Sequence, residues 1–328
     1  MNTGVVAIVG VGHAGQIVAR LLHRAGVARL RLIDTAIGVA ARRAEDMRRA
    51  AVVFGETLDV AASVDLADMR GADVVIVTAG LPAASLSSSD DLLAMNAAAM
   101  TQIGQAIGQV ARDAFVLCLT GPVAAMTARL QDASGLAPHR IAGVPSSAFI
   151  AELSLQIASE LDVAVADVRV NIIGGEFDAD DTAVLLRYST VAGVPLPEIV
   201  PPGQSGRERI EAAVARARKV AGEPGSGLRT GSASSAPAAL AVIAAKSYLS
   251  DQKRVLTLAA RLDGDYGERD VVVNAPVVIG RRGVERIIGL GLDDAERATF
   301  AEAVAVFRRR MALCADMAPA SVQTGTAP

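Results

Sequence analysis

Aromatic residues are scarce in this chain, which has no tryptophan, three tyrosines and six phenylalanines among 328 residues. Proteins that bind nucleic acids combine a basic surface with aromatic side chains on which bases stack. The formal net charge here is −3, so the chain is rich in neither feature. We therefore expect no nucleic-acid partner.

Cysteine is almost absent as well. Cys118 and Cys314 lie far apart in the sequence, so they suit neither a disulfide framework nor a metal site that needs clustered thiolates. We expect no metal site and a reducing, cytoplasmic location.

Long apolar runs are also missing, although 52% of the residues are hydrophobic. A helix that crosses a bilayer needs about 20 apolar residues, and the richest run, APAALAVIAA, ends at Lys246. The first residues, MNTGVVAIVG, have no basic leader of the kind found in signal peptides. We expect a soluble protein with no membrane partner and enough apolar material for one large or two moderate domains.

In the first half, short apolar runs alternate with stretches in which the apolar residues are spaced as in a helix. VVAIVG and RLRLID flank a stretch with helical apolar spacing, and the continuous runs ADVVIVTAG and AFVLCLT follow further helical stretches. Continuous apolar runs are typical of parallel strands that are covered on both faces. This alternation predicts a doubly wound α/β fold, a parallel Rossmann-type sheet over residues 1–145.

The pattern changes after about residue 145. Helices are predicted near 148–161, from about Gly206 and near 233–248, and the extended runs KRVLTLAARLDG and RDVVVNAPVVIG precede a last helix near 293–313. We expect an α+β substrate domain over residues 146–315 and a frayed tail at 316–328.

The stretch GVGHAG, from Gly10 to Gly15, matches G-x-G-x-x-G between a strand and a helix. In this motif the first glycine permits a tight turn, the second (Gly12) lets the backbone approach a pyrophosphate, and the third allows close packing of helix on strand. His13 and Ala14 lie within the loop, where the helix start offers N–H groups to the phosphates. We expect a dinucleotide-binding site here.

Asp34 ends the second predicted strand, RLRLID, about 20 residues after this loop. A carboxylate at that position accepts hydrogen bonds from the adenosine ribose hydroxyls and would repel the 2′-phosphate of NADP. The sequence therefore favours NAD as the cofactor.

From VTAGLP at residues 77–82 onward, the chain resembles the NAD-dependent malate and lactate dehydrogenase family. The likeness extends from about Gly4 to about Leu313. The segments that carry it are GVGHAG, VTAGLP, DDLLAMNA, RYSTVAGVP, GSASSAPA, DQKRVL, DGDYG and GRRGVERI. It implies that Thr78, Ala79, Gly80 and Thr120 also line the cofactor site, and that the protein forms a homodimer or homotetramer.

The resemblance also implies a reaction, hydride transfer between the nicotinamide and a carbon that bears a hydroxyl or carbonyl group. Family members move the proton with a histidine paired to an aspartate, hold the substrate carboxylate with an arginine, and polarise the carbonyl with a lid arginine. Each of these groups has a matching position in this sequence.

Most of these groups are replaced in this sequence. The lid arginines match Ala83 and Ser89, and the asparagine of the Ser-Asn-Pro turn matches Gly121. The D-x-x-R motif falls near Phe149 and Glu152, within a register of a few residues, and 141–168 contains neither arginine nor lysine. His-Gly-Asp reads Glu176-Phe177-Asp178, and the three histidines are His13, His23 and His139.

Carboxylates at Glu152 and Glu176 would repel an organic acid and attract a cation. We therefore expect a small-molecule substrate other than a simple 2-hydroxy or 2-keto acid, such as an amine or imine. Glu176 is then the candidate acid or base and Glu152 a candidate substrate contact.

Three other interpretations stay open. In the first and simplest, Glu176 and Glu152 are exposed side chains without a catalytic role. The chain is an inactive NAD-binding sensor, partner or assembly protein in the second. The third is a malate or lactate dehydrogenase with an unusual set of residues.

Overall fold

The computed structural model describes residues 4–27, 29–81, 89–146, 148–175, 181–200, 204–222 and 234–316. The predicted tail at 316–328 lies outside these ranges except for its first residue. Within them, no helix is both long and apolar enough to cross a membrane, and no three histidine, cysteine or acidic side chains are grouped so that they could hold a metal ion.

Strands and helices alternate in the first half, as the sequence predicts. The elements are β1 (Val5–Val9), α1 (His13–Arg24), β2 (Arg29–Ile33), α2 (Val39–Val53), β3 (Asp59–Ser63), β4 (Val74–Val77), α3 (Ser89–Val110), β5 (Phe115–Cys118), α4 (Val123–Ser134) and β6 (Ile141–Gly143). Neighbouring strands pair in parallel in the order β3-β2-β1-β4-β5-β6.

The second half mixes helices with antiparallel strands. Its elements are α5 (Ala148–Leu161), β7 (Val168–Arg169), β8 (Ile172–Gly174), β9 (Thr182–Val184), β10 (Thr190–Val191), β11 (Val194–Pro195), α6 (Leu196–Ile199), α7 (Gln204–Gly222), α8 (Ser235–Leu249), β12 (Arg254–Asp263), β13 (Arg269–Gly280), β14 (Gly283–Ile287) and α9 (Asp294–Asp316). The predicted fold class, a doubly wound parallel sheet followed by an α+β part, is confirmed.

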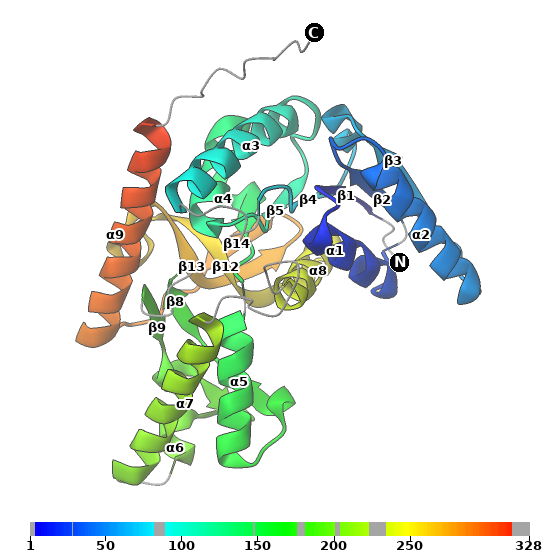
Figure 1. Cartoon of the computed structure of the whole chain (residues 1–328). Coiled ribbons are helices and arrows are strands. Elements are labelled where there is room, and N and C mark those ends of the chain that lie inside the picture. Colours follow the sequence, from blue (N-terminus) through cyan, green and yellow to red (C-terminus); the bar gives the residue numbers. More distant parts are fainter. Residues whose placement is uncertain are drawn as a thin grey trace.

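One sheet joins the two halves. Its order continues from β6 through β12, β13 and β8 to β9, and the junction is the antiparallel pairing of Ala259 with Gly143. In Figure 1, α1 and α8 lie together beside the parallel strands, while α5, α6 and α7 extend as a separate lobe below the sheet.

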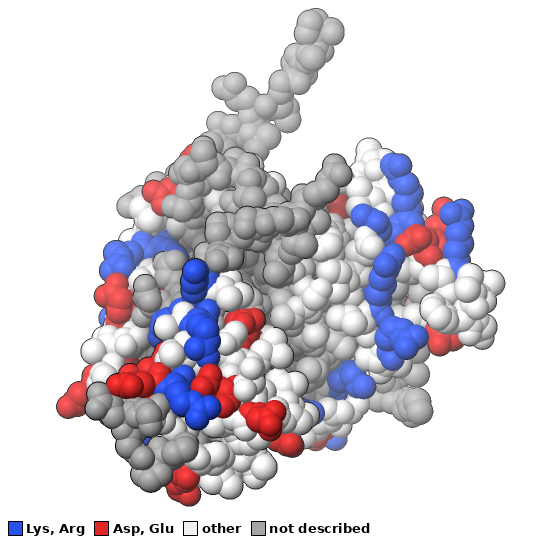
Figure 2. Space-filling view, turned by 60° about the horizontal axis from the view of Figure 1, so that its bottom comes forward, with Lys and Arg blue, Asp and Glu red and all other residues white. Residues whose placement is uncertain are grey.

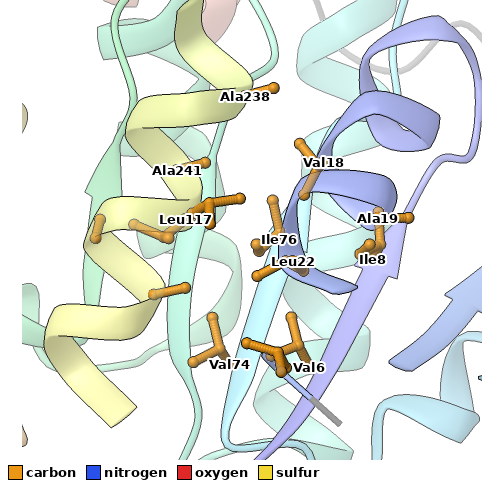
Figure 3. Close-up of a cluster of buried hydrophobic side chains, with 14 of the residues drawn as sticks. Val6, Ile8, Val18, Ala19, Leu22, Val74, Ile76, Leu117, Ala238 and Ala241 are labelled. Carbon is orange, nitrogen blue, oxygen red and sulfur yellow. The ribbon is translucent and has the colours of Figure 1, made fainter. Parts of the chain in front are cut away.

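The apolar core has two layers because successive side chains of a buried strand point to opposite faces. Val6, Ile8, Val74 and Ile76 face a layer that α1 and α8 cover (Figure 3). Their neighbours along the same strands face a layer that α3 covers; its members include Val5, Ala7, Val9, Val75, Val77, Met100 and Ile107. This arrangement fixes the carboxyl ends of the strands, where the candidate site lies.

The elements missing from the sequence-based prediction include β3 and α4. In β3, an edge strand, only Val60 is fully buried, so the segment lacks a continuous apolar run. In α4 nearly all residues from Val123 to Gln131 are buried, so no polar face gives the helix its usual periodicity.

Charged groups fix the turn between α8 and β12 to the turn between β13 and β14. Lys253 Nζ lies 2.7 Å from Asp251 Oδ1 and 2.7 Å from Glu285 Oε1, and Asp251 Oδ2 also accepts a hydrogen bond from Arg281 Nε at 3.0 Å. The hydrogen bond from Lys253 is the main reason that the pKa of Asp251 falls to about 2, from an ordinary value of 3.8.

This shift predicts a pH dependence of stability. A carboxylate whose pKa is lowered on folding stabilises the fold above its unfolded pKa of 3.8, and that contribution is lost as the pH falls towards about 2. Asp251→Asn should therefore be less stable than wild type at neutral pH, with a difference that closes between about pH 4 and pH 2. Urea unfolding at a series of pH values measures it, and a difference that stayed constant down to pH 2 would contradict the prediction.

Candidate cofactor and substrate site

The ten sequence-predicted cofactor residues come together at the carboxyl ends of β1, β2, β4 and β5. The chain order reverses between β1 and β4, which are neighbours in the sheet although β2 and β3 intervene in the sequence. In open α/β sheets, ligands bind in the crevice beside such a switch point. The position of the loops therefore fits a nucleotide site.

Gly10 and Gly15 are required by close contacts within the protein. Gly10 has a φ of +88°, and a Cβ there would lie 2.4 Å from the main-chain nitrogen of Ala79. A Cβ on Gly15 would lie 2.1 Å from the carbonyl oxygen of Gly10. That oxygen also accepts a hydrogen bond from Thr78 Oγ1 at 2.5 Å. These glycines let the loop, the start of α1 and the end of β4 pack together.

Gly12 has a different role. Its φ is −68°, which any residue can adopt, and a Cβ there would meet no atom of the described residues within 4 Å. No contact in the described part of the chain therefore requires glycine at this position, whereas a ligand that approaches the main chain would. His13 and Ala14 form the first turn of α1, His13 is exposed, and main-chain N–H groups at a helix start bind phosphate. This cradle fits the pyrophosphate of a dinucleotide.

Asp34 lies beside the glycine loop. Its Oδ2 accepts a hydrogen bond from the Val11 N–H at 2.8 Å, and its Oδ1 accepts one from the Ala36 N–H at 3.0 Å. The carboxylate is half-buried at the end of β2. It thus holds the loop that carries Gly12 and keeps a negative charge where a ribose would lie.

Asn96 bonds to the main chain next to two predicted cofactor residues, Gly80 and Thr120, and the sequence-based prediction missed it. Its side chain is 1% exposed. It accepts a hydrogen bond from the Leu81 N–H at 2.8 Å and donates one to the Gly121 oxygen at 2.8 Å. A Cβ on Gly80 would collide with Thr120, whose hydroxyl donates to the Ala79 oxygen at 2.6 Å. The only sequence signal was the motif DDLLAMNA that contains Asn96.

Of the two candidate catalytic residues, Glu152 belongs to the described part of the chain and Glu176 does not. Glu176, like Asp178, lies outside the described residues. Glu152 is half-buried on α5, and its Oε1 accepts a hydrogen bond from Gln156 Nε2 at 2.7 Å. Gln156 in turn accepts one from Arg216 of α7 at 2.9 Å, so Glu152 belongs to a polar chain between these two helices.

The glycine pair before Glu176 is held from two sides. Gly174 and Gly175 have φ values of +85° and +24°, and a Cβ on Gly175 would collide with Thr182. Asn274, a 4% exposed residue of β13, donates from Nδ2 to the Gly175 oxygen. The main chain from which residue 176 continues is therefore fixed by β9 and β13.

Arg218 brings a positive charge to this region, and the sequence-based prediction missed it too. Its guanidinium lies 5.5 Å from the centre of the Phe149 ring, and its Nη2 donates to the Thr182 oxygen at 3.0 Å. Phe149 lies near the position at which the sequence match places the family's D-x-x-R motif. The two residues are far apart in the chain, so only the packing of α7 on α5 shows that they meet.

The hollows of this half include the following two, both lined in part by residues next to or in β9. One, of about 10 Å³, is lined by Gly175, Asp181 and Arg310 among others and has room for little more than a water molecule. The other, of about 380 Å³, lies between α7, β9 and the start of α9, and Arg218 is one of its lining residues. Among the described residues that line the two, none belongs to the glycine loop.

The comparisons with known proteins agree along the whole chain. Residues 5–143 match the model of the lactate/malate dehydrogenase NAD binding domain, and residues 150–317 match that of the alpha/beta C-terminal domain. The chain belongs to the lactate/malate dehydrogenase family. Its cofactor is NAD, as the sequence predicts.

Two relatives are both named malate dehydrogenase. That of Xanthobacter autotrophicus is 42% identical over 96% of this chain and 97% of its own length. That of Methylobacterium radiotolerans is 42% identical over 92% of this chain and 93% of its own.

Solved structures of the family superpose closely on this chain. Malate dehydrogenase of Cryptosporidium parvum matches with a TM-score of 0.88 and 28% identity over 95% of this chain and 99% of its own. Lactate dehydrogenase of the same organism, complexed with lactic acid and NAD, matches with a TM-score of 0.88 and 30% identity over 97% of this chain and 100% of its own.

The expectation of a substrate other than a simple 2-hydroxy or 2-keto acid is wrong. The relatives at 42% identity are malate dehydrogenases. They support the third open interpretation, a malate or lactate dehydrogenase, and neither the amine enzyme nor the inactive protein. The wrong expectation rested on the charges at single positions of the lid and of the helix at 148–161. The charge around Phe149 also depends on Arg218, which comes from α7.

Gly12 and Gly15 provide a matched test of the cofactor cradle. Gly12→Ala should leave the melting temperature unchanged, because the added methyl group meets no protein atom. It should weaken NADH binding about 10-fold or more by holding the pyrophosphate away from the main chain. Gly15→Ala should lower the melting temperature, since its methyl group overlaps the Gly10 oxygen.

Calorimetry with NADH and thermal unfolding without it measure both effects. Gly55→Ala is the control for backbone strain without steric overlap. Gly55 has a φ of +70°, and no atom of the described residues lies within 4 Å of the added methyl group. Unchanged NADH affinity in Gly12→Ala would show that the cofactor does not approach this main chain.

Proposed function

We propose that the protein is an NAD-dependent dehydrogenase that interconverts a small 2-hydroxy acid and its 2-keto acid, with malate and oxaloacetate as the first candidates. The observation that carries this proposal is the 42% identity to malate dehydrogenases over 96% of the chain. The preserved cradle of Gly10, Gly12 and Gly15 with Asp34 supports it.

Bound NAD supplies the acceptor for the hydride that leaves C2 of the hydroxy acid. The chain must then remove the proton of the C2 hydroxyl group during oxidation and return it during reduction. We assign this step to Glu176. It follows the glycine pair at the position of the family's histidine, and the last histidine of the sequence is His139. Glu152 remains a second candidate for a contact with the substrate, although its bond to Gln156 favours a structural role.

The first test of the function is turnover. Purified protein should oxidise NADH when oxaloacetate is added, and pyruvate serves as the comparison substrate. Tight NADH binding without turnover of either acid, in the presence of the intact chain, would contradict the proposal.

Glu176→Gln tests the assigned base. The amide has the size of the carboxyl group but cannot accept the proton, so kcat should fall about 10²- to 10⁴-fold. The Kd for NADH should not change. Glu198→Gln, which alters an exposed carboxylate of the same half, is the matched control. A kcat within about two-fold of wild type in Glu176→Gln would exclude Glu176 as the proton carrier.

We also propose that the protein is a cytoplasmic homo-oligomer. Both cysteines are buried thiols outside any disulfide, which fits a reducing compartment. The last turn of α2 exposes Val52 (74%), Val53 (84%) and Phe54 (66%), and an apolar patch of this kind is typical of a protein interface.

Light scattering after size exclusion should give the mass of a dimer or tetramer. Val53→Asp should shift that mass towards the monomer, because an interface would then bury an unpaired charge. A wild-type monomer at micromolar concentration would contradict this part of the proposal.

A further inference from the structure

The pyrophosphate of NAD is a dianion, and the segments around the glycine loop contain almost no basic side chains. Residues 4–19, 71–111 and 113–128, which include β1, β4 and β5 and the loops at their carboxyl ends, contain no arginine or lysine. His13 is the only basic side chain of these segments. Figure 2 shows charged side chains gathered over α2 and over the lobe of α5–α7, with a mostly uncharged surface between them.

His13 lies at the end of α1 that receives the pyrophosphate. It is the first residue of the helix and follows Gly12, the N-cap. Because helical side chains tilt towards the N-terminus, the imidazole lies beside the helix start. The main-chain N–H groups of this first turn have no partner within the helix and bind anions at the same end. The first turn contains no acidic residue that would pair with the imidazole.

The imidazole of His13 is available to a ligand. It is exposed, and among the described residues it forms no hydrogen bond or ion pair. The other histidine of α1 is engaged, since His23 Nε2 lies 2.8 Å from Glu56 Oε2. The two ends of one helix therefore carry a free and a paired histidine.

Histidine gains or loses its charge between about pH 5 and 8, whereas carboxylic acids, thiols, tyrosine, lysine and arginine titrate outside the range from about pH 5.5 to 7.5. Asp34 stays bound to the Val11 N–H at 2.8 Å, and Arg20 pairs with Asp46 of α2 at 2.9 Å. The titratable side chains on the elements around the loop include Arg20 in α1, Asp34 after β2, Arg42 and Arg43 in α2, Asp90 and Asp91 in α3, Cys118 in β5, and Lys246 and Tyr248 in α8.

We propose that the imidazolium of His13 binds the pyrophosphate of the dinucleotide, so that cofactor binding takes up a proton. A bound dianion stabilises the charged form of a neighbouring imidazole. Linkage then requires the protonated protein to bind the dianion more tightly than the neutral form does. The affinity for the dinucleotide therefore falls as the pH rises. This inference rests on the NAD site and not on the identity of the substrate acid.

Calorimetry with NAD between about pH 5.5 and 7.5 tests the inference. Wild type should bind NAD about 5- to 10-fold more weakly at the higher pH, because a charge-assisted hydrogen bond to phosphate is lost. Titrations near pH 6.5 in MES and in Bis-Tris, which differ in their heat of ionisation, should show the uptake of a fraction of a proton. A constant affinity without proton uptake would overturn the inference.

Three variants assign the effect to one residue. His13→Gln keeps a hydrogen-bond donor without a charge, so its affinity for NAD should not change with pH and it should take up no proton. His13→Arg is always charged and should bind at the higher pH about as tightly as wild type binds at the lower pH. His23→Gln, on the same helix, is the matched control and should keep the wild-type pH dependence.

Melting temperatures of the two His13 variants should match that of wild type, because the side chain is exposed. If His13→Gln kept the pH dependence of wild type, another group would carry the proton and the inference would be wrong.

Two fragments of the cofactor locate the contact. ADP-ribose contains the pyrophosphate but no nicotinamide, so its affinity should change with pH as that of NAD does. Adenosine has no phosphate, and its affinity should stay constant. A pH dependence with NAD but not with ADP-ribose would contradict a contact with the pyrophosphate. These measurements need no turnover, so a failure to reduce oxaloacetate would contradict the proposed function and leave this inference standing.

Discussion

The main-chain contact between the glycine loop and the end of β4 is the constraint on which the cofactor half depends. Ala79 approaches Gly10 so closely that no side chain fits between them. Thr78 donates a hydrogen bond to the Gly10 oxygen, and Gly15 lies so near this oxygen that a Cβ would overlap it. These contacts place the start of α1 over the sheet at the switch point. Gly10 and Gly15 face atoms of the protein itself. Gly12 does not, so a ligand can approach the main chain at Gly12.

The same sheet links this half to the substrate half. Buried amides take part on both sides of the junction: Asn96 holds the ends of β4 and β5 together, and Asn274 of β13 holds the end of β8. An amide can donate and accept at once, so it can satisfy main-chain groups of irregular segments that have no strand partner. These hydrogen bonds thus fix the loops at the ends of β4, β5 and β8 to the sheet.

The sequence predicted those features that depend on local patterns. Apolar runs predicted β1, β2, β4 and β5, and a motif with fixed spacing predicted the glycine loop and Asp34. The sequence could not reveal Asn96 or Asn274 as connecting residues, since each bonds to segments distant in the chain. It also missed α4, because a helix that is buried all round lacks the amphipathic period from which helices are recognised.

The charge of the substrate site shows most clearly that sequence-based prediction misses contacts between distant segments. The replacement of charged residues at matched positions indicated a pocket that repels acids, and the named relatives contradict that conclusion. The potential at a point is the sum over all charges near it, whichever helix carries them. Around Phe149 that sum includes the guanidinium of Arg218, which is separated from it by more than the whole of α5 and the strands that follow. A change of sign at one position therefore does not fix the sign of the site, because packing brings together charges that the chain order keeps apart.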